Sequence, residues 1–222
     1  MSNLWKRRIS LIALWGVFLL FLMNGFQEHF LFYANVGAIC ILSLCWYQYD
    51  KKNPRLSELV LCACMITLAV AGRVFFLWAP GFKPVTGIVI IAGAALGGWN
   101  GFLCGSLSAL LSDMFFGQGP WTFFQMLAWG CIGLGAGCFR QWFSSRIVRI
   151  LYAIGAGVFF SVFMDVYSTM AAGSFLWSRY IAILLTSLPF TIMYMISNMI
   201  FVELLYPSLI KKLDRIRDKY DL

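Results

Sequence analysis

The chain has 222 residues, of which 61% are hydrophobic and 12% are charged, and its net charge is +8. Soluble domains are about 45–50% apolar and about 25% charged, so this composition excludes an ordinary soluble protein. It indicates an all-α, polytopic membrane helical bundle. The basic residues sit near the ends of apolar segments, as membrane topology requires, and we expect no nucleic-acid partner.

Eight transmembrane helices are predicted from the apolar segments. A bilayer span needs about 20 residues, and segments near this length lie at 9–27, 30–49, 57–79, 121–139, 149–172 and 180–206. The run 85–116 is too long for one helix. Because Gly97-Gly98-Trp99-Asn100-Gly101 interrupts it, we expect a short span over 85–97 and a second over 100–116.

The basic residues also orient the chain. With the N-terminus in the cytoplasm, all but three of the 17 lysine and arginine residues fall on the cytoplasmic side. The exceptions are Arg73, Lys83 and Arg179, at or near the outer face. Both termini are therefore predicted to be cytoplasmic. The C-terminal tail should form a basic amphipathic helix along the anionic inner leaflet, with a contact to a cytoplasmic partner as the alternative.

Three charged residues occur at a similar depth inside predicted spans. Arg73, Asp113 and Asp165 each lie on the order of 6–9 Å below the outer surface, counted along their helices. One interpretation is a buried ion pair that only ties helices together. The other is a polar cluster at the bottom of an outward-facing pocket, since ionisable groups within membranes commonly serve function.

The segment 117–130 adds the other candidate binding residues. Gly117-Gln118-Gly119-Pro120 predicts a tight turn before a new helix. At 100° per residue, Trp121, Gln125 and Trp129 share one face of this helix, and Gly130, Gly133 and Gly137 lie roughly opposite. Glycine faces allow close helix contact in membranes. We therefore expect a packing face of glycine and a pocket wall of aromatic and amide groups.

The motifs of several enzyme classes are missing. The sequence has no Gly-x-x-x-x-Gly-Lys-Ser/Thr phosphate loop, and His29 is its only histidine. We therefore do not expect ATP hydrolysis through a phosphate loop, serine-hydrolase activity or a zinc site. The cysteines lie within apolar runs and suit packing. We predict no catalytic residue, no metal site, no cofactor and no enzymatic activity.

Residues 72–138 resemble the substrate-binding S component of an energy-coupling factor (ECF) vitamin transporter. The resemblance rests on a series of short motifs: Gly72-Arg73, Pro84-Val85-Thr86, Gly101-Phe102-x-x-Gly105, Ser112-Asp113, Gly117-Gln118-Gly119-Pro120-Trp121-Thr122 and Gln125-Met126-x-Ala128-Trp129-Gly130. The subgroup most similar to this glycine- and tryptophan-rich pattern is associated with cobalamin or related corrinoids. A queuosine precursor or another vitamin is the alternative substrate.

The resemblance implies an organisation and a set of partners. It implies a six-helix core over 57–206, preceded by a helix pair over 1–56 and followed by the tail over 207–222. Substrate would enter from outside, and the loaded protein would topple in the cell membrane to release it inside. A transmembrane coupling protein would dock on Ala63, Thr67 and Ala71, and two ATPase subunits would supply the energy. Threonine stands at 67 where the family usually has alanine.

The candidate substrate-binding residues therefore come from five parts of the chain: Arg73, Lys83, Asp113, Gln118, Trp121, Gln125, Trp129 and Asp165. Two functions of another class stay open on sequence grounds. One is a proton-coupled secondary transporter that uses Asp113 or Asp165 as its proton site. The other is a membrane scaffold whose buried charges are structural.

Overall fold

A computed structural model describes residues 36–37, 39–41, 43, 56–173 and 175–219. The predicted helix at 9–27 and most of that at 30–49 lie outside the described residues. The described elements are all helical: α3 (Leu56–Phe75), α4 (Val85–Leu96), α5 (Gly98–Phe116), α6 (Pro120–Cys138), the short 3-10 helix η1 (Arg140–Trp142), α7 (Arg146–Ala171) and α8 (Trp177–Lys219).

Three of these helices are long and apolar enough to cross a membrane, namely α3, α7 and α8. Helix α4 is apolar but shorter, with 12 residues. The described part of the chain is thus that of a multi-pass helical membrane protein. The count of eight spans and the cytoplasmic position of both termini stay predictions.

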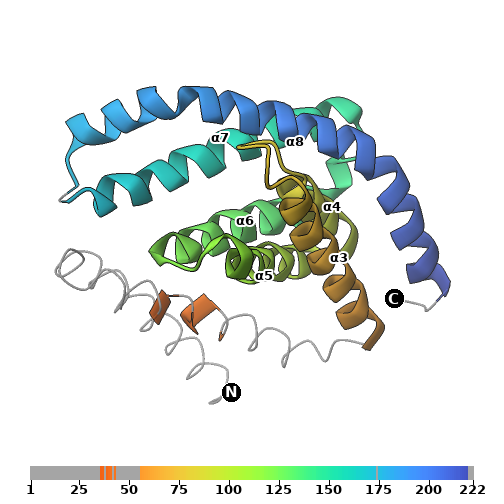
Figure 1. Ribbon diagram of the computed structural model, residues 1–222. Helices are drawn as coiled ribbons and strands as arrows, with labels where there is room; N and C mark the ends of the chain where they lie inside the picture. Colours follow the sequence, from red (N-terminus) through yellow and green to blue (C-terminus); the bar gives the residue numbers. More distant parts are fainter. Residues whose placement is uncertain (1–35, 38, 42, 44–55, 174, 220–222) are drawn as a thin grey trace, which may run out of the picture.

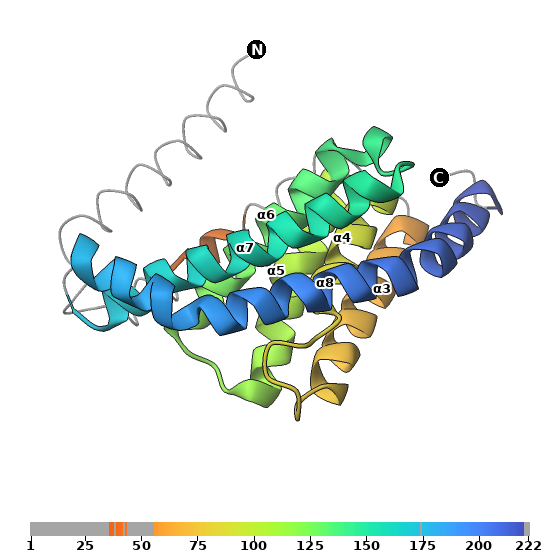
Figure 2. The ribbon, with the colours of Figure 1, turned by 90° about the horizontal axis from the view of Figure 1, so that it is seen from above.

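Helices α7 and α8 lie side by side (Figures 1 and 2). Helix α4 packs against both of them and α6 packs against α7, while α5 packs against α4 and α6. Helix α3 crosses the α5–α6 pair steeply in Figure 1 and contacts α4 and α5. The break between α4 and α5 falls where the sequence predicts it. Gly97 separates the two helices with φ 93°, a left-handed conformation that glycine adopts at low cost.

The predicted glycine face of α6 packs as expected. A Cβ added at Gly133 would overlap the backbone carbonyl of Gly101 on α5, and one at Gly137 would overlap the backbone of Gly98. On α5, a Cβ at Gly105 would meet the carbonyl oxygen of Trp129. The backbones of α5 and α6 therefore touch directly, which fixes the register of the two helices.

Helix α8 extends further than the predicted span over 180–206. It continues to Lys219 through Pro207, although a proline inside a helix removes one backbone hydrogen bond and costs about 3 kcal/mol. The residues beyond it explain why the helix persists. Leu213 is buried, and Leu209, Ile210 and Ile216 pack against the core, so apolar burial offsets the loss at the proline. Figure 1 shows α8 changing direction along this C-terminal part.

Candidate functional site

A buried arginine near the end of α3 joins three helices. Arg73 is 6% exposed, and its Nη1 donates to Asp113 Oδ1 at 2.7 Å and to the hydroxyl of Ser112, both on α5. Its Nη2 donates to Gln125 Oε1 on α6 at 3.0 Å. The sequence places Arg73, Asp113 and Gln125 as separate candidates, and the structure brings them into direct contact.

Asp113 is fully buried and links this group to the turn before α6. Its second oxygen accepts a hydrogen bond of 2.7 Å from Thr122 Oγ1, which in turn accepts one of 3.3 Å from the backbone amide of Gly119. Gly117 has φ 96°, a left-handed value that a side chain would strain. The predicted turn therefore exists, and it holds the threonine that fixes the carboxylate.

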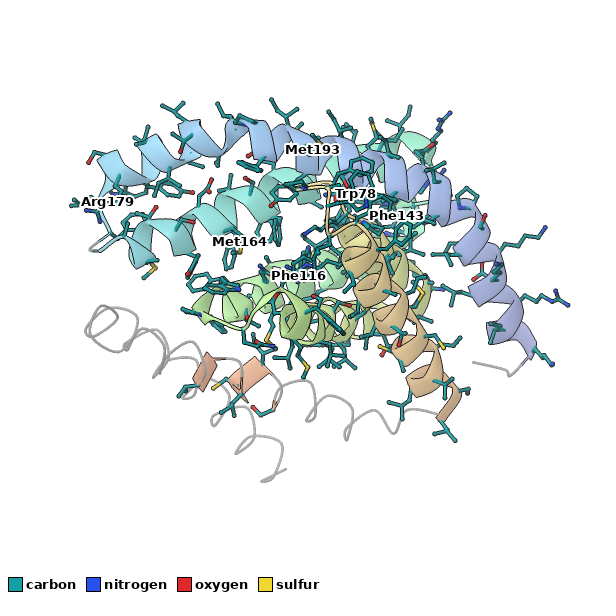
Figure 3. The ribbon with its side chains drawn as sticks, viewed as in Figure 1. Trp78, Phe116, Phe143, Met164, Arg179 and Met193 are labelled. Atoms are coloured by element: carbon teal, nitrogen blue, oxygen red, sulfur yellow. The ribbon has the colours of Figure 1, made fainter. Side chains whose placement is uncertain are left out.

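Aromatic rings surround the arginine. The guanidinium carbon lies 4.5 Å from the centroid of Phe116 and 4.8 Å from that of Trp129, within the range of cation–π attraction. Phe116, the last residue of α5, is labelled in Figure 3. We call Arg73, Asp113, Phe116, Gln125 and Trp129 the arginine cluster.

Trp129 connects the arginine cluster to α4, α7 and α8. Its indole nitrogen donates to Thr86 Oγ1 at 3.0 Å, and its ring stacks on Phe160 at 4.9 Å and 15°. Phe160 contacts Tyr194 edge to face at 5.3 Å. Trp129 is itself 4% exposed. Trp129 of α6, Phe160 of α7 and Tyr194 of α8 thus form a column of three rings across three helices.

Lys83 reaches the same site from the loop between α3 and α4, residues 76–84. Its Nζ lies 4.2 Å from the Phe116 centroid. Its backbone amide donates to Ser197 Oγ on α8 at 2.9 Å, and the Ser197 hydroxyl donates to the Lys83 carbonyl at 3.1 Å. Burial, and then the nearby Arg73 charge, hold the pKa of Lys83 below its usual range, while Asp113 offsets part of this.

Asp165 belongs to a second polar group, between α7 and α8. It accepts a hydrogen bond of 2.6 Å from Ser187 Oγ, and one turn further along Ser161 and Thr191 share a hydrogen bond of 2.6 Å. The three charges predicted at one depth therefore divide, with Arg73 and Asp113 paired and Asp165 bonded to α8.

Two other candidates lie outside the arginine cluster. The Trp121 ring packs edge to face on Tyr167 of α7, with centroids 6.5 Å apart. Gln118 is exposed, and its side chain donates to the Leu110 carbonyl at 2.8 Å. In the structure, Gln118 closes the turn after α5, and its amide points back onto that helix.

The sequence reasoning did not single out several residues that the structure places at this site. Two of them could have been found from residue spacing. Phe116 follows Asp113 by one helical turn, which places the two on the same helix face. Thr122 stands three residues after Gly119 at a predicted helix start, the spacing of a helix cap. Ser197 gave none, because only the fold brings it to the 76–84 loop.

The predicted docking residues share one surface of α3. Ala63, Thr67 and Ala71 are all exposed, and the Thr67 hydroxyl bonds to the Ala63 carbonyl of its own helix at 2.9 Å. The opposite side of α3 carries buried residues such as Met65 and Ala69. The Thr67 hydroxyl is thus satisfied within its own helix, and this exposed surface of α3 consists of short side chains.

Within the described residues, no group of three or more histidine, cysteine, aspartate or glutamate side chains could hold a metal ion. The arginine cluster offers hydrogen-bond donors, flat rings and fixed charge. Such groups are suited to a polar, planar molecule, and the low dielectric of a bilayer strengthens each hydrogen bond. The fold and the arginine cluster are those expected of a membrane-embedded binding protein.

Comparison with known protein families agrees with this class. A family model described as ECF-type riboflavin transporter, S component, matches residues 54–214. The chain belongs to this family of transporter components. The matched region holds α3 to α7 and most of α8, and so contains the whole arginine cluster. Neither the curated proteins nor the solved structures compared with the chain gave a match.

Proposed function

We propose that the chain is the substrate-binding subunit of an ECF-type importer for a flat, heteroaromatic vitamin, with riboflavin as the first candidate. The arginine cluster carries this proposal, because it combines buried donors with aromatic rings inside the region that the family match covers. The family description names riboflavin. The sequence-based expectation of cobalamin or a related corrinoid lacks that support, and cobalamin serves as the competing ligand in the test.

The proposal includes the partners. The exposed Ala63, Thr67 and Ala71 surface of α3 would receive the transmembrane coupling protein, since small residues let two membrane helices approach closely. Two ATPase subunits would drive toppling in the cell membrane. Residues 57–206 would form the six-helix core, within an eight-helix protein that has both termini in the cytoplasm.

Ligand identity is tested on the purified full-length protein. Small molecules that co-purify are identified by mass spectrometry, and riboflavin, cobalamin and a queuosine precursor are then titrated by calorimetry. We expect saturable riboflavin binding that weakens at least tenfold in Trp129→Ala, because this change removes a ring from the column. Tight binding of cobalamin without riboflavin binding would replace the first candidate, and binding of none would refute the proposed function.

The partners are tested by co-purification. Thr67→Trp adds a large ring to the small surface of α3, and we expect it to abolish capture of the coupling protein while riboflavin binding persists. Leu111→Trp, at an exposed position on α5, is the matched control. Uptake that survives ATP depletion but collapses with the proton gradient would instead favour a proton-coupled transporter.

A further inference from the structure

Arg73 has a donor that the protein itself does not use. Both of its terminal nitrogens are engaged, but the Nε atom is buried and has no hydrogen-bond partner. An unpaired buried donor costs about 1–3 kcal/mol, and more when it is charged, so native proteins seldom leave one without a reason. The residue is 6% exposed, so bulk solvent does not easily satisfy this atom.

A second cation stands at the same ring. The Lys83 Nζ and the Arg73 guanidinium carbon lie 4.2 and 4.5 Å from the centroid of Phe116. The carboxylate paired with Arg73 is that of Asp113, and its two oxygens already accept bonds from Arg73 and Thr122. Two positive charges thus meet one negative charge, which leaves the site electropositive and short of acceptors. Burial first, and the Arg73 charge second, hold the pKa of Lys83 below its usual range.

We propose that Arg73 Nε and Lys83 Nζ together receive one acceptor edge of the substrate, a ring carbonyl with its neighbouring atom or a carboxylate. This inference rests on the proposed function and deepens it, because it states which chemical group the site selects. For a flavin, the group is one of the two carbonyls of the pyrimidine-dione ring, with the ring plane against the aromatic column. Gln125 and Asp113 act as positioning residues, since they hold the guanidinium through its other nitrogens.

The test combines protein variants with altered ligands. Calorimetry on the full-length protein compares riboflavin with 2-thioriboflavin and 4-thioriboflavin, each of which replaces one carbonyl oxygen by sulfur, a weaker acceptor. Lys83→Met removes the charge and keeps the length of the side chain. The double variant R73Q/D113N removes the Arg73 donor and keeps the buried site neutral. Lys211→Met, at an exposed position on α8, is the control.

We expect Lys83→Met and R73Q/D113N to weaken riboflavin binding by about 10- to 100-fold, the usual worth of a charged hydrogen bond. For one of the two thio analogues, the same protein variants should weaken binding by only about threefold or less, because the sulfur of that analogue has already removed the contact. Lys211→Met should bind all three ligands as wild type does. Elution as a single species and an unchanged thermal transition confirm folding of Lys83→Met.

Two results would overturn the inference while the proposed function stands. One is riboflavin binding by both variants within twofold of wild type. The other is an equal loss for riboflavin and both thio analogues, which would show that the charges act on folding or on another part of the ligand. A wild-type protein that binds no riboflavin would overturn the inference and the flavin assignment together.

Discussion

The buried ion pair offers the sharpest test of the site, through Asp113→Asn. This change keeps the shape of the side chain but removes its charge. Arg73, whose side chain is 7% exposed, would then be a cation in the bundle without its carboxylate partner. The chain supplies its own control. The pair of Arg146 and Glu203 has a similar N–O distance, 2.6 Å, yet the Arg146 side chain is 74% exposed.

The two ion pairs differ in how deeply they are buried, and burial sets the cost of breaking them. Removing one partner of a buried pair costs roughly 3–5 kcal/mol, because the other charge is left uncompensated. Asparagine can still accept one of the two bonds that Asp113 accepts, so we expect about 3 kcal/mol for Asp113→Asn. For Glu203→Gln we expect about 0–1 kcal/mol, since exposed pairs contribute little.

The assay is the free energy of unfolding in mixed micelles, measured for Asp113→Asn, Arg73→Gln and the double variant. In the double variant no buried charge is left alone, so its loss should be smaller than the sum of the single losses by about 2–3 kcal/mol. Additive losses would show that Arg73 and Asp113 are not energetically coupled. A loss below about 1 kcal/mol in Asp113→Asn would contradict the burial argument itself.

Two further predictions concern the frame around the site. In the same unfolding assay, Gly133→Ala should destabilise the protein by about 1–3 kcal/mol, because the new Cβ would overlap the Gly101 carbonyl. Gly155→Ala is the control, since no atom of a neighbouring helix lies within 4 Å of its new Cβ. This change should be neutral or stabilise the protein by up to about 1 kcal/mol. Equal effects would contradict the close helix contact. Ser197→Ala removes both hydrogen bonds to the Lys83 backbone, so amide hydrogen exchange in residues 76–84, measured by mass spectrometry, should become faster. Unchanged exchange would show that other contacts hold this loop.

The faces of individual helices could be predicted from the sequence, because helical periodicity is local. The break at Gly97, the turn at 117–120 and the glycine face of α6 all occur in the structure as the sequence predicts. The substrate did not follow in this way, since the motif pattern suggested cobalamin and the family match names riboflavin.

Which side chains meet depends on contacts between helices. Asp165 shares the predicted depth of Arg73 and Asp113 but bonds to Ser187, because α7 pairs with α8 along this stretch. Helix α8 passes its predicted end because core contacts of Leu213 and its neighbours offset Pro207. Both contacts depend on the rotation and tilt of a whole helix relative to its neighbours, and the spacing of residues within one segment does not predict these.

Hydropathy, glycine and proline act locally, so the membrane class, the helix breaks and the residue types available for a site can be read from the residue order alone. The site itself depends on how the helices pack. The tertiary structure paired Arg73 with Asp113, placed the guanidinium against Phe116 and Trp129, brought Lys83 to the Phe116 ring and left Arg73 Nε unpaired. The physical reason is that backbone contact between α5 and α6, and the Ser197 bonds to the 76–84 loop, fix distances that no local pattern encodes.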